Sequence, residues 1–457
     1  MRRKILTIVA LSALAAACVH APENNAPVSE DTVPVSADPS EKPALSDDPV
    51  VSEDPDISQE PSAEPPAEVT ISNLKLRTWL INHFDENGDG KLTEDELEKV
   101  TSVTLRVING YGRSTGEGMA NINELALLPN LEYLDARDNN LTKVDLGGCS
   151  KLRYLDLSYN RVNSIVSLPA TLEYLDLSHN NLSEFDFTTL PALKYLDCGE
   201  NKLSVADLSA CPDLEYLGVY TNSLTSLSMP DKVTELQCYD NSLPELVLPL
   251  GIETVNCAGN AIKALDLGGR TYLETLVCSF NGLSSLDVSG HDGLVSLSCD
   301  NNGMASLSLG GCSSLRYLDC SSNDLTSLDL GGLGSLEVAG AGFNSLSSVA
   351  LGGCGSLRGL YLQDNALEKI DLSACSALEN LYLHHNSLES VSLSSNPRLR
   401  AVHLSENSLA GVLDVSGNPL LKVLYTLSNP SLESIKVADP DAVDTAFWHN
   451  DTQTKIL

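Results

Sequence analysis

Apolar residues recur with a long and regular period between residues 131 and 437. The stretch 315–330 reads LRYLDCSSNDLTSLDL, in which leucine or cysteine alternates with other residues and an asparagine follows. That asparagine recurs at intervals of 19 to 22 residues, most often 21, at Asn139, Asn160, Asn180, Asn201, Asn222, Asn241, Asn260, Asn281, Asn302, Asn323, Asn344, Asn365, Asn386, Asn407 and Asn429. A period of this length predicts that residues 131–437 form one array of about fifteen similar units.

Each unit is expected to contain a short strand followed by a turn. In the L-x-x-L-x-L part, inward leucines alternate with outward variable residues, as in a strand with one buried face. The asparagine then turns the chain, and we expect its side chain to bond neighbouring backbone in a ladder through the stack. Only stacking on neighbours buries the apolar face of a unit. Parallel strands about 4.8 Å apart would make fifteen units roughly 70 Å long.

Residues 71–130 precede the array and contain a different motif. Positions 72–84 combine a Ser or Asn cap with apolar residues at mostly helical spacing. The next stretch, DENGDGKLTEDE, has the oxygen-bearing residues and the central glycine of an EF-hand calcium loop. The expected ligands are Asp85, Asn87, Asp89, the carbonyl of Lys91, Thr93 and the bidentate carboxylate of Glu96. Because the loop has no second copy, we expect weak, structural binding of calcium.

These motifs resemble known repeat proteins. The units match the leucine-rich-repeat signature L-x-x-L-x-L-x-x-N-x-L, and their 21-residue period, cysteines and L-D-L segments resemble the internalin-like repeats of bacterial surface proteins. An EF-hand directly before such an array is similar to the N-terminal cap of lipid-anchored repeat proteins from Bacteroidetes-type bacteria. The resemblance covers about Leu74 to Leu457. It implies an α/β solenoid with a parallel β-sheet on its concave face, an EF-hand cap, and extracellular binding of a ligand or host molecule.

The first residues are typical of an export signal. Residues 1–17 hold a basic start, an apolar run too short to span a membrane, and small residues directly before Cys18. This ending resembles a lipobox and implies a lipid on Cys18, at the bacterial outer membrane or cell surface or on the periplasmic face. Because Ala15 replaces the usual Leu, ordinary signal cleavage is the alternative. Residues 18–70 are acidic and proline-rich, which predicts a disordered tether.

Charge and cysteine content limit the classes of partner. The formal net charge of −34 opposes binding to nucleic acid, because phosphate backbones are themselves negative. Eleven of the 12 cysteines fall inside the repeats at two fixed offsets from the asparagine. Neighbours in such a stack stay about 5 Å apart, whereas a disulfide needs Cβ atoms at roughly 3.5–4.5 Å. We therefore expect these cysteines to be small buried core residues.

Outward positions of the strands provide the candidate ligand surface. One column near the start of the array contains Tyr133, Tyr154, Tyr174, Tyr195 and Tyr216, beside the acidic column Asp135, Asp156, Asp176 and Asp197. A column near the end contains Tyr361, Tyr382, His403 and Tyr425, flanked by His384 and His385. Aromatic side chains with polar tips suit contacts with a protein or glycan ligand. Alternatively, the rings stack on their neighbours and only stabilise the sheet.

The sequence indicates a binding module rather than an enzyme. It contains no G-x-S-x-G or H-E-x-x-H motif and no phosphate-binding glycine loop between a strand and a helix. The repeat pattern ends at 437, and we expect residues 438–457 to cap the last unit. The predicted function is binding of a protein or glycan ligand on the concave face of a monomer. The alternative is an envelope scaffold or spacer without a specific ligand.

Overall fold

The fold is known from a computed structural model that describes residues 67–105, 118–439 and 447–457. Residues 68–457 form one compact unit. The predicted signal peptide, Cys18 and residues 18–66 of the predicted tether lie outside the described residues, as do residues 440–446 of the predicted C-terminal cap. No described helix is both long and apolar enough to cross a membrane.

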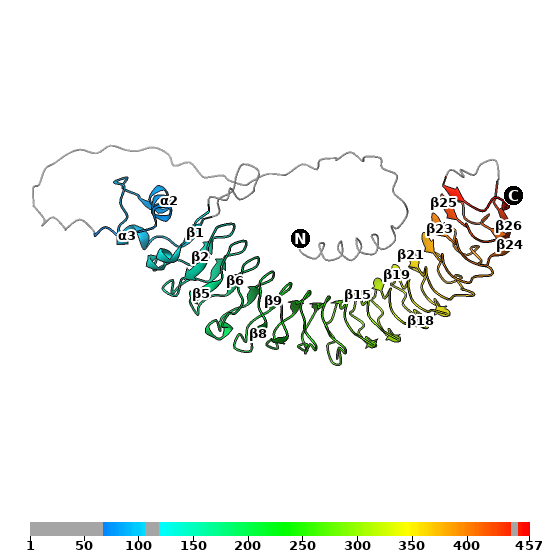
Figure 1. The fold of residues 1–457 in the computed structure, drawn as a ribbon, viewed down its shortest axis with the longest axis horizontal. Coiled ribbons are helices and arrows are strands. Elements are labelled where there is room, and N and C mark those ends of the chain that lie inside the picture. Colours follow the sequence, from blue (N-terminus) through cyan, green and yellow to red (C-terminus); the bar gives the residue numbers. More distant parts are fainter. Residues whose placement is uncertain (1–66, 106–117, 440–446) are drawn as a thin grey trace, which may run out of the picture. The chain divides into compact units, whose positions relative to one another are not determined.

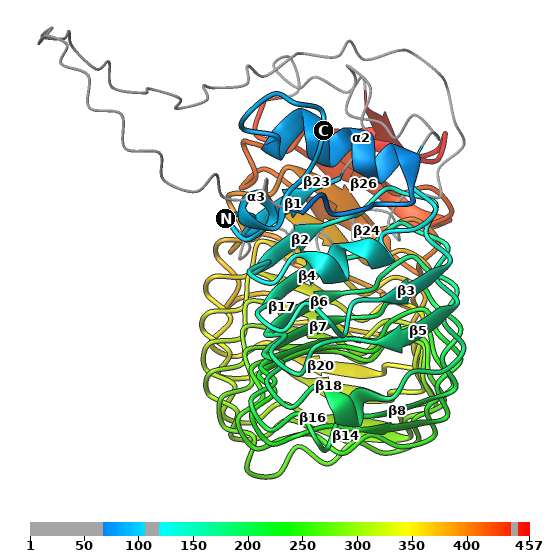
Figure 2. The same cartoon turned by 90° about the vertical axis from the view of Figure 1, so that its left-hand side faces the viewer.

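Two α-helices precede the repeats: α2 (Leu74–Phe84) and α3 (Glu94–Leu97). The side chain of Asn73 accepts hydrogen bonds from the first turn of α2, as the sequence predicts for a cap. Both helices lie at the β1 end of the array (Figures 1 and 2). Of two short 3-10 helices, η2 (Asn123–Leu127) lies just before the array and η3 (Phe187–Thr189) lies within the first repeats.

One 17-stranded, parallel sheet runs along the concave side of the array (Figure 1). Its strands pair in chain order: β1 (Ser102–Thr104), β2 (Tyr133–Asp135), β4 (Tyr154–Asp156), β6 (Tyr174–Asp176), β7 (Tyr195–Asp197), β9 (Tyr216–Gly218), β11 (Glu235–Gln237), β12 (Thr254–Asn256), β13 (Thr275–Val277), β15 (Ser296–Ser298), β17 (Tyr317–Asp319), β19 (Val338–Gly340), β21 (Gly359–Tyr361), β22 (Asn380–Tyr382), β23 (Ala401–His403), β25 (Val423–Tyr425) and β27 (Trp448–His449). Strand β27 places residues of the predicted C-terminal cap against the last repeat.

Shorter sheets line the opposite, convex side. Their strands are β3 (Lys143–Asp145) with β5 (Ser164–Ser167), β8 (Val205–Asp207) with β10 (Ser226–Ser228), β14 (Ser285–Asp287) with β16 (Ser306–Ser308), β18 (Ser327–Asp329) with β20 (Ser348–Ala350), and β24 (Ala410–Asp414) with β26 (Ser431–Lys436) and β28 (Lys455–Ile456). Between β10 and β14 the chain, which is fully described there, forms no convex strand. Pro244 and Pro249 lie in this stretch and have no N–H to donate to a strand ladder.

The repeating asparagines form the predicted ladder. Asn323 is typical: its Nδ2 donates to the carbonyls of Cys299, Cys320 and Ser321 at 3.0–3.1 Å. Its Oδ1 accepts from the backbone N–H of Met304 at 3.0 Å. One side chain thus satisfies four backbone groups of two successive repeats, which holds the turn of one unit to the next.

The residue before each of these asparagines has a left-handed backbone. Fourteen of the fifteen are not glycine, with φ between 48° and 59°, and Gly259 with φ of 63° occupies the remaining position. The side chains at this position are as different as those of Asp138, Tyr159 and Phe343. A left-handed conformation costs free energy for such residues, so the asparagine ladder must hold it in place.

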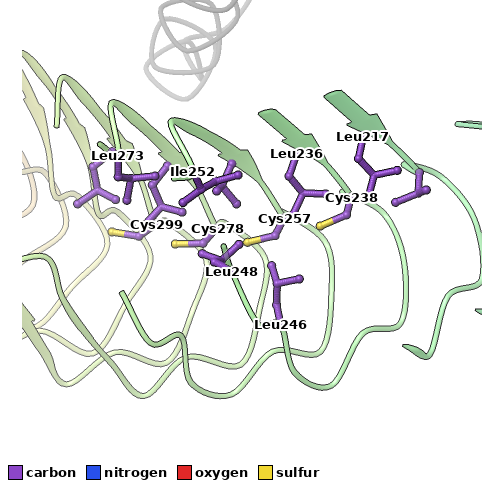
Figure 3. Close-up of a cluster of buried hydrophobic side chains, with 14 of the residues drawn as sticks. Leu217, Leu236, Cys238, Leu246, Leu248, Ile252, Cys257, Leu273, Cys278 and Cys299 are labelled. Atoms are coloured by element: carbon purple, nitrogen blue, oxygen red, sulfur yellow. The ribbon is translucent and has the colours of Figure 1, made fainter. Parts of the chain in front are cut away.

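The eleven repeat cysteines are all buried and unpaired, as the sequence predicts. Cys238, Cys257, Cys278 and Cys299 point into the core from successive repeats beside leucines (Figure 3). Other cysteines have a polar role that the sequence interpretation did not include. Cys312 and Cys354 each donate Sγ–H at 3.1 Å to a carbonyl of the preceding repeat.

Cys312 and Cys354 belong to the cysteine column that lies ten residues after the repeating asparagines. At other positions of this column, a different residue contacts the equivalent carbonyl. His291 contacts the equivalent carbonyl through Nε2 at 3.2 Å, and Asn396 donates to it through Nδ2 at 3.1 Å. Where the column holds a donor, the side chain satisfies a carbonyl of the preceding repeat, whereas Leu190 and Leu333 at the same position only fill the core.

Candidate ligand surface on the concave face

The five tyrosines near the start of the array form one continuous stack, which we call the tyrosine ladder (Tyr133, Tyr154, Tyr174, Tyr195 and Tyr216). Strand register places them directly opposite one another. Successive ring centroids are 4.2–4.3 Å apart, and the planes differ by only 6–13°. The three inner rings are covered on both faces. The sequence predicted this column, and the structure shows the stacked arrangement that was its stabilising alternative.

The acidic column beside the tyrosine ladder is mostly buried. Asp135, Asp156 and Asp197 are 3%, 2% and 7% exposed. Arg137 donates to both carboxylate oxygens of Asp135 at 2.6–3.2 Å, and its Nε lies 3.5 Å from Asp156. Burial, opposed by hydrogen bonds to the carboxylate, raises the pKa of Asp197 to about 7. Four stacked carboxylates thus depend on a single arginine and on local hydrogen bonds.

The predicted column near the end of the array is also in register. Tyr361, Tyr382, His403 and Tyr425 lie opposite one another on β21, β22, β23 and β25. Neighbouring ring centroids are 5.1–6.0 Å apart, and the planes differ by 37–73°. These rings are tilted or edge-to-face, so they do not cover one another as the tyrosine ladder does.

The two adjacent histidines have different environments. The ring of His384 stacks on that of His403 with centroids 3.9 Å apart. His384 therefore belongs with Tyr361, Tyr382, His403 and Tyr425 to one group of rings, which we call the ring cluster. His385 instead lies at the rim, where its Nε2 is 3.1 Å from Glu406 and its Nδ1 is 3.8 Å from Asp364. Burial lowers the pKa of His384 and of His403 to about 4, so both rings are neutral at neutral pH.

Two members of this cluster were missed by the sequence interpretation. Gln363 is 6% exposed and lies one strand from His384 in the same outward column. The repeat period would have identified it. The ring of His449 lies 4.9 Å from that of Tyr425 and extends the cluster into the C-terminal cap. No repeat signal marks His449, because the pattern has ended.

The predicted calcium loop joins α2 to α3. Gly88 and Gly90, both with positive φ, donate backbone N–H bonds of 2.8 Å to the two carboxylate oxygens of Asp85. The Glu96 carboxylate is 6% exposed and accepts from the backbone and hydroxyl of Thr93 at 2.9 Å. These hydrogen bonds hold the pKa of Glu96 below its ordinary value, against the opposing effect of burial.

The strand edge at the end of the predicted calcium loop is paired within the chain. Glu68 forms an antiparallel bridge with Thr93, and the N–H of Val69 donates to the carbonyl of Leu92 at 2.7 Å. This end of the predicted loop is therefore joined to the residues that precede α2. Among the described residues, no three His, Cys, Asp or Glu side chains converge into a ready set of metal ligands.

The cap is tied to the first repeats by Glu124. Its two carboxylate oxygens accept from the backbone N–H groups of Ser72 and Asn73 at 2.7 and 2.9 Å.

On the convex side, an open hollow of about 500 Å³ is lined by Ile165, Phe185 and Asp186 among others. It contains none of the predicted site residues.

Comparison with known proteins supports the repeat assignment. A family model for leucine-rich repeats in two copies matches residues 129–170 and 170–210, and a single-repeat model matches residues 314–336. Neither model describes an enzyme. A search of curated proteins found no match to the chain.

Solved structures of bacterial repeat proteins have the same fold. The functional domain of InlJ from Listeria monocytogenes, described as including a cysteine ladder, is 25% identical with a TM-score of 0.60, over 76% of each chain. The leucine-rich effector YopM from Yersinia pestis is 28% identical with a TM-score of 0.55, over 65% of this chain and 83% of its own. A leucine-rich-repeat protein of Leptospira interrogans is 20% identical with a TM-score of 0.52, over 64% and 77%. The chain is a leucine-rich-repeat solenoid with internalin-like structural neighbours.

Proposed function

We propose that the chain is a binding module that takes a protein or glycan ligand on its concave face, at the ring cluster of β21, β22, β23 and β25. The observation that carries this proposal is the tilted arrangement of Tyr361, Tyr382, His403 and Tyr425. Rings that do not cover one another leave apolar surface for a partner. The tyrosine ladder has its inner ring faces covered, so we assign it a stabilising role.

Capture of surface components by the full chain tests this assignment. The ligands held by the wild type would be compared with those held by a Tyr361→Ala, Tyr382→Ala double variant and by a Tyr154→Ala, Tyr195→Ala control. We expect the first variant to lose captured material and the control to keep it. Equal capture by all three proteins would refute binding at the ring cluster.

An envelope spacer without a ligand is the second candidate function. It is favoured by the stacking of the tyrosine ladder, which uses aromatic surface for internal stability. It predicts that the double variant at Tyr361 and Tyr382 loses no partner. The capture comparison therefore separates the two functions.

We further propose that the loop between α2 and α3 binds a structural calcium ion. The side chains of Asp85, Asn87, Asp89, Thr93 and Glu96 and the carbonyl of Lys91 would hold it. The positive φ of both glycines and the ionised Glu96 carboxylate fit this assignment. Because Glu96 now bonds Thr93, its carboxylate would have to turn toward the ion.

Thermal melting with calcium or with EDTA tests the calcium site. We expect millimolar calcium to raise the melting temperature of the wild type and to leave a Glu96→Gln variant unchanged. A Glu94→Gln variant, which changes a neighbouring carboxylate outside the expected ligand set, is the control. Identical melting of the wild type in calcium and in EDTA would refute the site.

The proposed location is the bacterial outer membrane or cell surface, with a lipid on Cys18. The lipobox-like sequence before Cys18 supports this proposal. Metabolic labelling with a fatty acid should mark the wild type and not a Cys18→Ser variant. Protease treatment of intact cells should then distinguish the cell surface from the periplasmic face.

A further inference from the structure

Four successive repeats present an uncharged surface, which we call the neutral patch. It comprises the outward positions of β21, β22, β23 and β25 and of the residues directly after them: Gly359, Tyr361, Gln363, Asn380, Tyr382, His384, Ala401, His403, Ser405, Val423, Tyr425 and Leu427. None is Asp, Glu, Lys or Arg, although the chain has a net charge of −34. The equivalent positions of β2, β4, β6 and β7 hold four aspartates and one arginine.

Charged residues border the neutral patch, and many of them pair with one another. On one side, Glu379 lies between Arg358 at 3.7 Å and Arg400 at 3.4 Å. On the other side, His385 lies between Asp364 and Glu406. A charged ligand group in the centre of the patch would lose water without gaining an opposite charge. The patch therefore favours an uncharged ligand.

The rings of the neutral patch offer apolar surface. A Cβ atom at Gly359 would lie 3.0 Å from Cε2 of Tyr361, so the Tyr361 ring leans over the backbone where the glycine leaves room. The rings of Tyr382 and Tyr425 meet that of His403 edge-to-face. Because the face of an aromatic ring is negative, it attracts the weakly positive C–H groups of an aliphatic ring.

Two buried polar atoms of the patch lack a hydrogen-bond partner in the described structure: Oε1 of Gln363 and Nδ1 of His384. Such atoms cost free energy, and a ligand hydroxyl that bonded either of them would recover it after the Gln363 amide or the His384 ring had turned to face the ligand. A peptide would not find a strand edge here, because β21, β22, β23 and β25 are hydrogen-bonded on both sides.

We propose that the neutral patch binds an uncharged saccharide chain, with C–H faces of the sugar rings on the tyrosines and hydroxyl groups bonded to Gln363 and His384. This inference deepens the proposed binding function and rests on it. The repeat spacing of about 4.8 Å per strand gives an extended, shallow surface, which suits a linear oligomer lying along the array.

Direct binding of defined sugars tests the inference. The full chain would be titrated with linear neutral oligosaccharides of glucose, galactose, mannose and N-acetylhexosamines, and with uronate-containing counterparts of the same linkage. We expect at least one neutral oligosaccharide to bind, and its uronate counterpart to bind about tenfold more weakly or less. The Tyr361→Ala, Tyr382→Ala variant should weaken neutral binding at least about tenfold, whereas Tyr154→Ala, Tyr195→Ala should not.

An Ala401→Glu variant keeps every ring and adds one charge to the patch. It therefore tests the patch in a protein whose loss of binding cannot be attributed to misfolding after removal of rings. It should also weaken neutral binding at an unchanged melting temperature. Failure of all neutral oligosaccharides to bind would overturn the inference, as would binding that ignores these substitutions. If captured proteins still depend on Tyr361 and Tyr382 in that case, the proposed binding function stands without the saccharide.

Discussion

The tyrosine ladder and the neutral patch both consist of outward side chains of the same sheet, yet their rings lie in neighbouring columns and are arranged differently. In the ladder, identical rings in register stack at 4.2–4.3 Å and cover one another. In the patch, one histidine interrupts a column of three tyrosines, and the small Gly359 lets a ring tilt. An aromatic column in a repeat protein therefore indicates a ligand surface only when its ring faces are left uncovered.

The carboxylates beside the tyrosine ladder depend on a buried ion pair, whereas the ion pairs of the neutral patch lie at its exposed rim. This contrast predicts the largest difference in unfolding free energy between two variants. Arg137→Ala should destabilise the protein by about 2–4 kcal/mol, because it leaves the buried Asp135 and Asp156 without their counter-charge. Arg400→Ala, at the exposed rim of the patch, should cost less than about 1 kcal/mol. Denaturant unfolding of both variants measures the difference, and equal losses would contradict it.

Single ring removals should separate stability from binding. Tyr195→Ala removes two stacked contacts and should cost roughly 1–3 kcal/mol of unfolding free energy. Tyr382→Ala removes more distant, tilted contacts and should cost about half as much, while ligand binding falls. Unfolding curves for both variants, set beside their capture of ligand, check this prediction. A Tyr195→Ala variant of unchanged stability would show that the ladder is not structural.

The two regions should also differ in the sign of the pH dependence of their stability. The pKa of Asp197 is about 7 when folded, above its ordinary value of 3.8, so the folded state binds the extra proton between these values. Stability near Asp197 should therefore rise as the pH falls from 7 toward 4. Folding lowers the pKa of His384 and of His403 from 6.5 to about 4, so the unfolded state binds more protons between these values. Local stability at these histidines should therefore decrease as the pH falls from 6.5 toward 4.

Hydrogen exchange resolved by peptide, at pH 7.5 and 5, can detect these opposite signs after correction for intrinsic exchange rates. Asp197→Asn should reduce the change in the ladder, where burial also raises the pKa of Asp176, and His384→Gln should reduce the change in the patch. The same sign in both regions of the wild type would contradict the assigned environments.

The sequence predicted the fold well because its strongest signals repeat. The asparagine period located the asparagine ladder and the strands. The offsets of the cysteines from these asparagines identified the cysteines as core residues. The left-handed residues could not be predicted, because Asp138, Tyr159 and Phe343 share no chemical feature and the conformation is imposed by the following asparagine. The donor role of His291 was hidden for a similar reason, because several residue types can satisfy the same carbonyl.

For the candidate site, the sequence identified the columns and not the ring geometry. Register followed from the period, so Tyr361, Tyr382 and His403 could be placed together. Whether rings stack or tilt depends on small neighbours such as Gly359 in the adjacent column, whose effect requires coordinates. His449 was out of reach because it belongs to the cap.

We propose that the concave face is divided into a structural tyrosine ladder and a binding patch. The most direct test is hydrogen exchange of the full chain with and without the neutral oligosaccharide that binds best. Slower exchange confined to residues 359–363, 380–385, 401–405 and 423–427 is the predicted result. Protection over residues 133–218 instead, with none in the patch, would show that the ligand binds at the tyrosine ladder.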